Sequence, residues 1–232
     1  MAKYITCIDD FNVGLGELNT IIYYAKRNQK NRDKYLTFIK SSVILLVSKF
    51  EAFLEDSVSD YVEVVENSGF KPGDFPEVLK LHCMDKLIDE KFISDVRKHR
   101  SRALVTVERI SKFCYGKDEI TNVDIDTQFD YGKHGESAIT KLFARIGITN
   151  VFESCIVYEK KETLAGAKGD LVPVSIAADI NALTNIRNNI LHGDATPSLT
   201  HEQVENYKRH IKMFSEKIVE KLEKEIDNLV GK

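Results

Sequence analysis

Apolar residues recur at intervals of three and four along most of the chain, which is the spacing of a helix face that packs on a core. The clearest case runs from Leu36 to Val65, contains no Gly or Pro, and predicts one long helix. Its centre, Val43–Val47, is apolar on every side, which indicates burial all round. An earlier stretch, Asp9–Lys30, predicts a first helix with its core face at Phe11, Leu15, Leu18, Ile22 and Ala25.

The last part of the chain has the same pattern. Ser175–His192 predicts a helix that is followed by Gly193, a residue type favoured just after a helix C-terminus. Thr200 and Gln203 have the spacing of a capping box, which predicts the start of a closing helix that extends to about Leu229.

The middle of the chain is less regular. Leu79–Tyr115 predicts helix in two pieces. Between residues 116 and 173, only Glu136–Ile146 predicts a firm helix. Val151–Tyr158 fits either a short strand or a helical turn, and Ala165–Asp170 predicts a mobile loop.

Composition agrees with an all-α bundle. A chain of 232 residues is long for one small bundle and short for two domains, so we expect one domain over 1–232 with 116–173 as an irregular insertion. Hydrophobic residues make up 43% of the chain and charged residues 30%, which is enough for a substantial core. The formal net charge is −3, so any RNA contact must come from a local cluster of cations.

The cysteines favour neither a thiolate metal site nor a disulfide framework, because no two of them form a CxxC pair. They are Cys7, Cys83, Cys114 and Cys155. No stretch approaches the roughly 18 apolar residues of a membrane span, and Lys3, Asp9 and Asp10 interrupt any signal peptide. We therefore expect a reducing cytoplasm as the location.

The helix predicted over Ser175–His192 has two faces. Its core face is Ile176, Ile180, Leu183, Ile186 and Ile190. A second face consists of uncharged polar side chains where Lys and Glu would be usual on a solvent face, and its members are Asn181, Asn185, Asn188 and His192. Such a stripe is typical of a surface that meets another molecule, and Arg187 lies at its edge.

This run contains the parts needed for metal-free RNA cleavage. His192 lies at the helix end, where the helix dipole favours an imidazolium that can donate a proton. Arg187 offers a planar, permanent charge that suits a phosphate, and the RNA supplies its own 2′-hydroxyl as the nucleophile. Five residues of helix place Arg187 and His192 roughly 140° apart, so one copy makes a poor site. Two copies about a two-fold axis could combine these groups in one cleft.

The sequence Arg187-Asn188-xxx-His192 resembles the Arg-polar-xxx-His signature of HEPN domains, and its surroundings resemble the RiboL-PSP branch. The supporting segments are Lys49–Leu54, Lys141–Ile148 and Ile186–Gly193. The resemblance implies an HEPN-type helical homodimer with a metal-independent ribonuclease site and no cofactor. It implies that Arg187, His192 and Asn188 form the catalytic set and that Glu51 orients Arg187. It further suggests a bacterial toxin or anti-phage effector, controlled by an antitoxin or another regulatory protein.

Several of these residues also fit purely structural roles. Arg97, Lys98, Arg100 and Arg102 fit either a contact to the RNA backbone or a solvated helix face. Arg187 and His192 also fit a helix end in which His192 caps carbonyls and Arg187 pairs with a buried acid such as Glu51.

Metal binding is not expected at His82 or His134, because neither has partners at ligand spacing. The alternative function is a non-catalytic HEPN dimer that binds nucleic acid or a protein.

Overall fold

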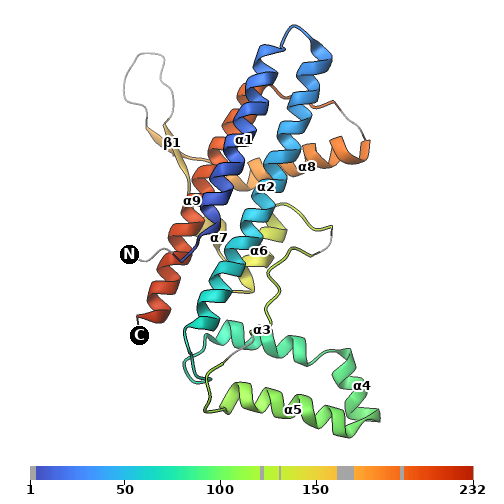
Figure 1. Cartoon of the computed structure of the whole chain (residues 1–232), viewed down its shortest axis with the longest axis vertical. Coiled ribbons are helices and arrows are strands. Elements are labelled where there is room, and N and C mark those ends of the chain that lie inside the picture. Colours follow the sequence, from blue (N-terminus) through green and yellow to red (C-terminus); the bar gives the residue numbers. More distant parts are fainter. Residues whose placement is uncertain (1–3, 121–122, 131, 161–169, 194–195, 232) are drawn as a thin grey trace.

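Three long helices lie side by side and form the body of the protein (Figure 1). The computed structural model describes residues 4–120, 123–130, 132–160, 170–193 and 196–231. In it, α1 (Cys7–Arg27) and α2 (Arg32–Asn67) form an antiparallel hairpin, and α9 (His201–Val230) packs against both. The helix α8 (Ile176–Gly193) crosses this layer and contacts α2 and α9. The prediction of an all-α bundle is confirmed.

The helix α2 is long because nothing in its sequence interrupts the helical ladder. Asn31 caps its start by accepting a hydrogen bond from the backbone N–H of Lys34 at 3.2 Å. The predicted centre is buried at Val43, Leu46 and Val47, whereas Ile44 and Leu45 are half-buried. One side of this segment is therefore buried and the other side is only half-buried, so the prediction of burial on every side is only partly correct.

The segment predicted as two helices contains three. They are α3 (Glu77–Leu87), α4 (Glu90–Lys98) and α5 (Arg100–Tyr115). Asp89 starts α4 by accepting a hydrogen bond from the N–H of Phe92 at 2.7 Å. His99 has an extended φ of −138° and separates α4 from α5. This group of helices lies at the lower end of the molecule, away from α8 (Figure 1).

The segment before α8 mixes short elements. It contains α6 (Glu136–Ala144) and α7 (Val151–Ser154), followed by β1 (Tyr158–Lys160) and β2 (Leu171–Pro173). The two strands pair antiparallel, with Tyr158 opposite Pro173. Residues 151–158 thus hold both of the structures that the sequence left open, a helical turn and then the start of a strand. Of the predicted mobile loop, residues 165–169 lie outside the described residues.

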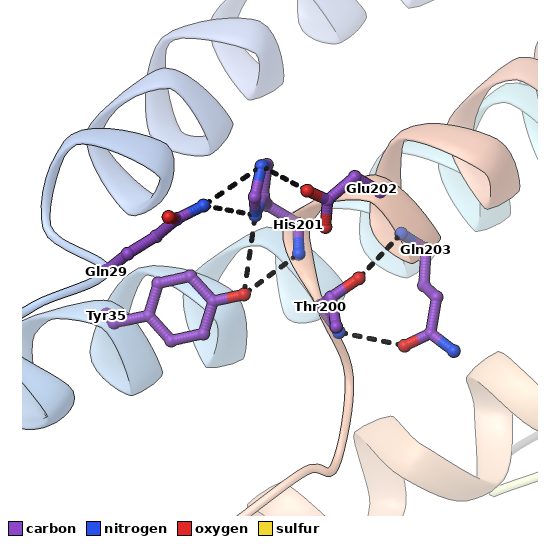
Figure 2. Close-up of polar contacts among 6 residues, drawn as sticks. All are labelled: Gln29, Tyr35, Thr200, His201, Glu202 and Gln203. Carbon is purple, nitrogen blue, oxygen red and sulfur yellow. Dashed lines mark hydrogen bonds and ion pairs between the residues drawn. The ribbon is translucent and has the colours of Figure 1, made fainter.

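The start of α9 is attached to the turn between α1 and α2 through His201 (Figure 2). The His201 side chain is only 4% exposed, and its Nε2 donates to the Glu202 carboxylate at 2.9 Å. That leaves Nδ1 as an acceptor for the Gln29 amide, 3.3 Å away. The hydroxyl of Tyr35 accepts the backbone N–H of His201 at 3.0 Å.

A capping box completes the junction between α8 and α9. The Thr200 hydroxyl accepts the N–H of Gln203 at 3.3 Å, and the Gln203 side chain accepts the N–H of Thr200 at 2.8 Å. The predicted capping box is confirmed, and the chain that leaves α8 is held at a fixed point. Within the described ranges, no helix is both long and apolar enough to cross a membrane.

Candidate functional site

The core face of α8 determines where its polar residues lie. Ile176, Ile180, Leu183 and Ile190 are buried, and Ile186 is half-buried against the same core. With this face packed on α2 and α9, Arg187 is directed toward α2, and the end of α8 lies at the edge of the molecule (Figure 1). His192 and Leu191 at that end are exposed.

Arg187 contacts one acid and one amide. Its Nη2 lies 3.9 Å from Oε2 of Glu51 on α2, and its Nη1 donates to Oδ1 of Asn188 at 2.9 Å. The side chain is 18% exposed, and its Nε is buried without a hydrogen-bond partner among the described residues. Because 3.9 Å is too long for a hydrogen bond, most of the five guanidinium donors have no strong acceptor among the described residues. Glu51 and Asn188 hold the guanidinium in place, and part of its hydrogen-bonding capacity is left for an anion.

Glu51 has a second partner that the sequence did not indicate. Its other carboxylate oxygen, Oε1, lies 2.7 Å from Nδ1 of His134. The two side chains are 21% and 25% exposed, so the pair is half-buried and still reachable. A single carboxylate on α2 therefore joins the arginine of α8 to a histidine from the loop before α6.

The loop that presents His134 is attached along α2 by two further glutamates. Glu55 accepts the N–H of Phe129 at 2.8 Å, and Glu66 accepts the N–H of Val123 at 2.5 Å. Arg145, after α6, also holds this loop, with 2.6 Å between its Nη2 and the Asp130 carboxylate. Contacts with two elements, α2 and the end of α6, thus position the loop.

Gly135 allows the close approach of this loop to α8. Its φ of 84° and ψ of −168° belong to a region that is essentially restricted to glycine. A Cβ at this position would lie 2.8 Å from Oδ1 of Asn181. The absence of a side chain lets the chain turn into α6 directly after His134.

The predicted amide stripe is partly used within the chain. Asn181 accepts the N–H of Glu136 at 3.0 Å and donates to its carboxylate at 3.1 Å, which fastens the start of α6 to α8. Asn188 accepts from Arg187, as described above. Asn185 and His192 are exposed. The surface available to another molecule is thus narrower than the stripe and is concentrated toward the end of α8.

The predicted RNA-contacting run does not join this cluster. Arg97, Lys98, Arg100 and Arg102 are exposed around the junction of α4 and α5. Figure 1 shows these helices at the opposite end of the long axis from the end of α8. In a single chain, these four cations therefore lie apart from Arg187.

The thiols lie outside the cluster. Burial raises the pKa of Cys7 to about 12 and that of Cys83 to about 11. All four cysteines are unpaired, and burial also raises the pKa of Cys155, so these three buried thiols are not suited to act as nucleophiles at neutral pH. Within the described part of the chain, no group of three or more His, Cys, Asp or Glu is arranged to hold a metal ion.

The comparisons with known proteins agree with the motif. The model of one family, described as RiboL-PSP-HEPN, matches residues 9–224. That region includes Glu51, His134, Arg187 and His192. No curated protein and no solved structure match the chain.

Proposed function

The chain belongs to the RiboL-PSP-HEPN family, and on that premise we propose that it is a metal-independent endoribonuclease that acts as a homodimer. The observation that carries the proposal is the state of Arg187. It is a half-buried cation, held by Glu51 and Asn188, with donors left over for an anion. In this proposal Arg187, His192 and Asn188 are the catalytic residues and Glu51 is the supporting residue.

The chemistry follows from the groups present. The 2′-hydroxyl of RNA gives up its proton to a base as it attacks the adjacent phosphorus, and the bond from phosphorus to the 5′-oxygen of the next nucleotide breaks. Arg187 binds the phosphate and stabilises the charge that develops on its oxygens. His192 donates a proton to the departing 5′-oxygen. The products are a 2′,3′-cyclic phosphate and a 5′-hydroxyl, and no redox step or co-reactant is required.

The separation of the two groups supports a composite site. Arg187 faces α2, whereas His192 is exposed at the end of α8, five residues on and roughly 140° around the axis. The exposed Leu191 beside His192 offers an apolar contact for a second copy. In the proposed dimer, His192 of one copy approaches Arg187 of the other.

Binding of the RNA backbone is proposed for Arg97, Lys98, Arg100 and Arg102. They are exposed, and none forms an ion pair with another described residue. Such contacts would add to affinity and to its salt dependence, and they would leave the cleavage step unchanged. Replacing the four residues by Gln should weaken RNA binding and reduce the steepness of its salt dependence.

The proposed setting is the cytoplasm of a bacterium, where the protein would act as a toxin or an anti-phage effector under the control of a regulatory protein. Expression of the wild-type chain in a bacterium should arrest growth and degrade RNA. Arg187→Ala and His192→Ala should each abolish both effects. If the wild type and both variants behave alike, the nuclease proposal fails. The alternative function is then a non-catalytic HEPN dimer that binds nucleic acid or a protein.

Two measurements test the mechanism and the assembly. Cleavage of total cellular RNA by the purified protein should persist in EDTA, and loss of cleavage would contradict the metal-free chemistry. A mixture of Arg187→Ala and His192→Ala chains, unfolded and refolded together, should recover activity that neither has alone, because mixed dimers contain one intact Arg and one intact His. No recovery, or an active monomer, would contradict the composite site.

A further inference from the structure

We propose that His134 is a second proton-transfer group of the ribonuclease site, the general base that takes the proton from the 2′-hydroxyl. The inference rests on the proposed function and adds a residue that lies outside the Arg-polar-xxx-His motif. Its starting point is the carboxylate of Glu51, which contacts Arg187 through Oε2 and His134 through Oε1.

Glu51 determines the tautomer of His134. A carboxylate only accepts hydrogen bonds, so the 2.7 Å contact requires a proton on Nδ1 of the histidine. In the neutral ring, Nε2 is then the basic nitrogen. Among the described residues, no hydrogen bond to this Nε2 is found, and the side chain is 25% exposed. The ring is thus oriented by an acid and has an unoccupied acceptor, which is the arrangement that prepares a histidine to remove a proton.

The placement of His134 and Arg187 on one carboxylate fits the arrangement of the reacting groups in RNA. The 2′-hydroxyl and the scissile phosphate of RNA are on neighbouring carbons of one ribose. The two side chains that would act on them, His134 and Arg187, contact the two oxygens of one carboxylate: Nδ1 of His134 contacts Oε1 of Glu51 and the guanidinium of Arg187 contacts Oε2. His134 would take the 2′-hydroxyl proton as the O2′–P bond forms, Arg187 of the same copy would hold the phosphate oxygens, and His192 of the second copy would protonate the 5′-oxygen.

Glu51 from α2 is the charged group that contacts His134, and Arg187 from α8 contacts the same carboxylate. Glu136 at the start of α6 and Lys133 in the same loop are its charged neighbours along the chain. Glu136 is engaged by Asn181, and Lys133 is exposed. Glu51 is therefore the partner that orients His134.

The decisive variant is His134→Asn, because its amide N–H2 can still donate to Glu51 while the basic nitrogen is lost. We expect its rate of cleavage of total cellular RNA to fall by about 100-fold or more. The acidic limb of the rate–pH profile should disappear with it. Affinity for 2′-O-methylated RNA, which lacks the nucleophile, should stay within about 2-fold.

Two additional variants separate proton transfer from positioning. His134→Ala should regain part of its rate when free imidazole is added, and Lys133→Gln, an exposed change in the same loop, should cleave at the wild-type rate. A fully active His134→Asn, or an unaltered pH profile with no imidazole rescue, would overturn the inference. That result is distinct from failure of the proposed function, in which the wild-type protein itself does not cleave RNA.

Discussion

Arg187 and Glu51 are 136 positions apart in the sequence, yet their Nη2 and Oε2 atoms lie 3.9 Å apart between α8 and α2. The carboxylate compensates a cation that is 18% exposed and leaves it able to contact another anion. We expect Glu51→Gln to reduce RNA cleavage by about 10-fold or more, because Arg187 loses its ionic partner and His134 its charged acceptor. The rate should be measured with total cellular RNA at neutral pH.

The matched control for this change is Glu63→Gln, on an exposed position of the same helix. It removes the same charge from α2 without touching the cluster, so both rate and stability should stay close to wild type. Equal rates for Glu51→Gln and Glu63→Gln would show that the contact does not serve the reaction.

Gly135 gives a prediction about how the loop is positioned. Gly135→Ala should lower the free energy of unfolding by roughly 2–3 kcal/mol, because alanine rarely adopts this φ and ψ and its Cβ would clash with Asn181. Gly132→Ala is the control: its φ is 70°, but a Cβ there meets no atom within 4 Å, so only the backbone cost of about 1 kcal/mol applies. Urea denaturation measures both. Equal losses would mean that the contact with Asn181 does not constrain the loop.

The sequence predicts the long helices well because each buries one continuous face. The spacing of Phe11, Leu15 and Leu18, for example, is sufficient to identify α1 and its core side. The relative directions of Arg187 and His192 were also predictable, because both lie on α8 five residues apart; their catalytic roles stay a proposal. The pairing of Glu51 with Arg187 was suggested by the resemblance, and the structure contains that contact.

His134 could not be predicted in the same way, because a loop has no periodicity to indicate which side chain points inward. Its position depends on contacts with Glu51 and Glu55, which precede their loop partners by 83 and 74 residues. The sequence signal for such a partner is the pair Glu51 and Glu55, one turn apart on a helix whose neighbouring positions are core. In the structure both glutamates are half-buried. Carboxylates in that setting require partners, and His134 and the N–H of Phe129 provide them.

The junction at His201 leads to a prediction about stability. Tyr35→Phe removes the hydroxyl that accepts the backbone N–H of His201 at 3.0 Å. We expect the free energy of unfolding to fall by about 1 kcal/mol, because a part-buried donor at the start of α9 loses its acceptor. Tyr115→Phe, at a residue that is 86% exposed, is the control and should leave stability unchanged. If both variants unfold at the same urea concentration as wild type, the hydroxyl contributes nothing to the junction.

His82 on α3 predicts sensitivity to acid. Burial lowers the pKa of His82 below its ordinary value of 6.5, and the nearby charges of Lys86 and Arg145 lower it further, against opposing effects of Asp85 and Asp126. Its Nε2 is buried without a hydrogen-bond partner among the described residues, so a proton there would be poorly accommodated. The unfolded chain therefore binds a proton that the folded chain resists. The contribution to stability is complete above pH 6.5 and is lost as the pH falls toward the lower folded value.

The variant His82→Gln should remove this dependence, since glutamine does not titrate. Thermal unfolding at a series of pH values from 7.5 down to about 5 should show a smaller fall in Tm for His82→Gln than for wild type. His99→Gln, at an exposed position between α4 and α5, should follow the wild-type curve. If His82→Gln and wild type lose stability in parallel over that range, the acid sensitivity comes from other groups and not from the half-buried ring of His82.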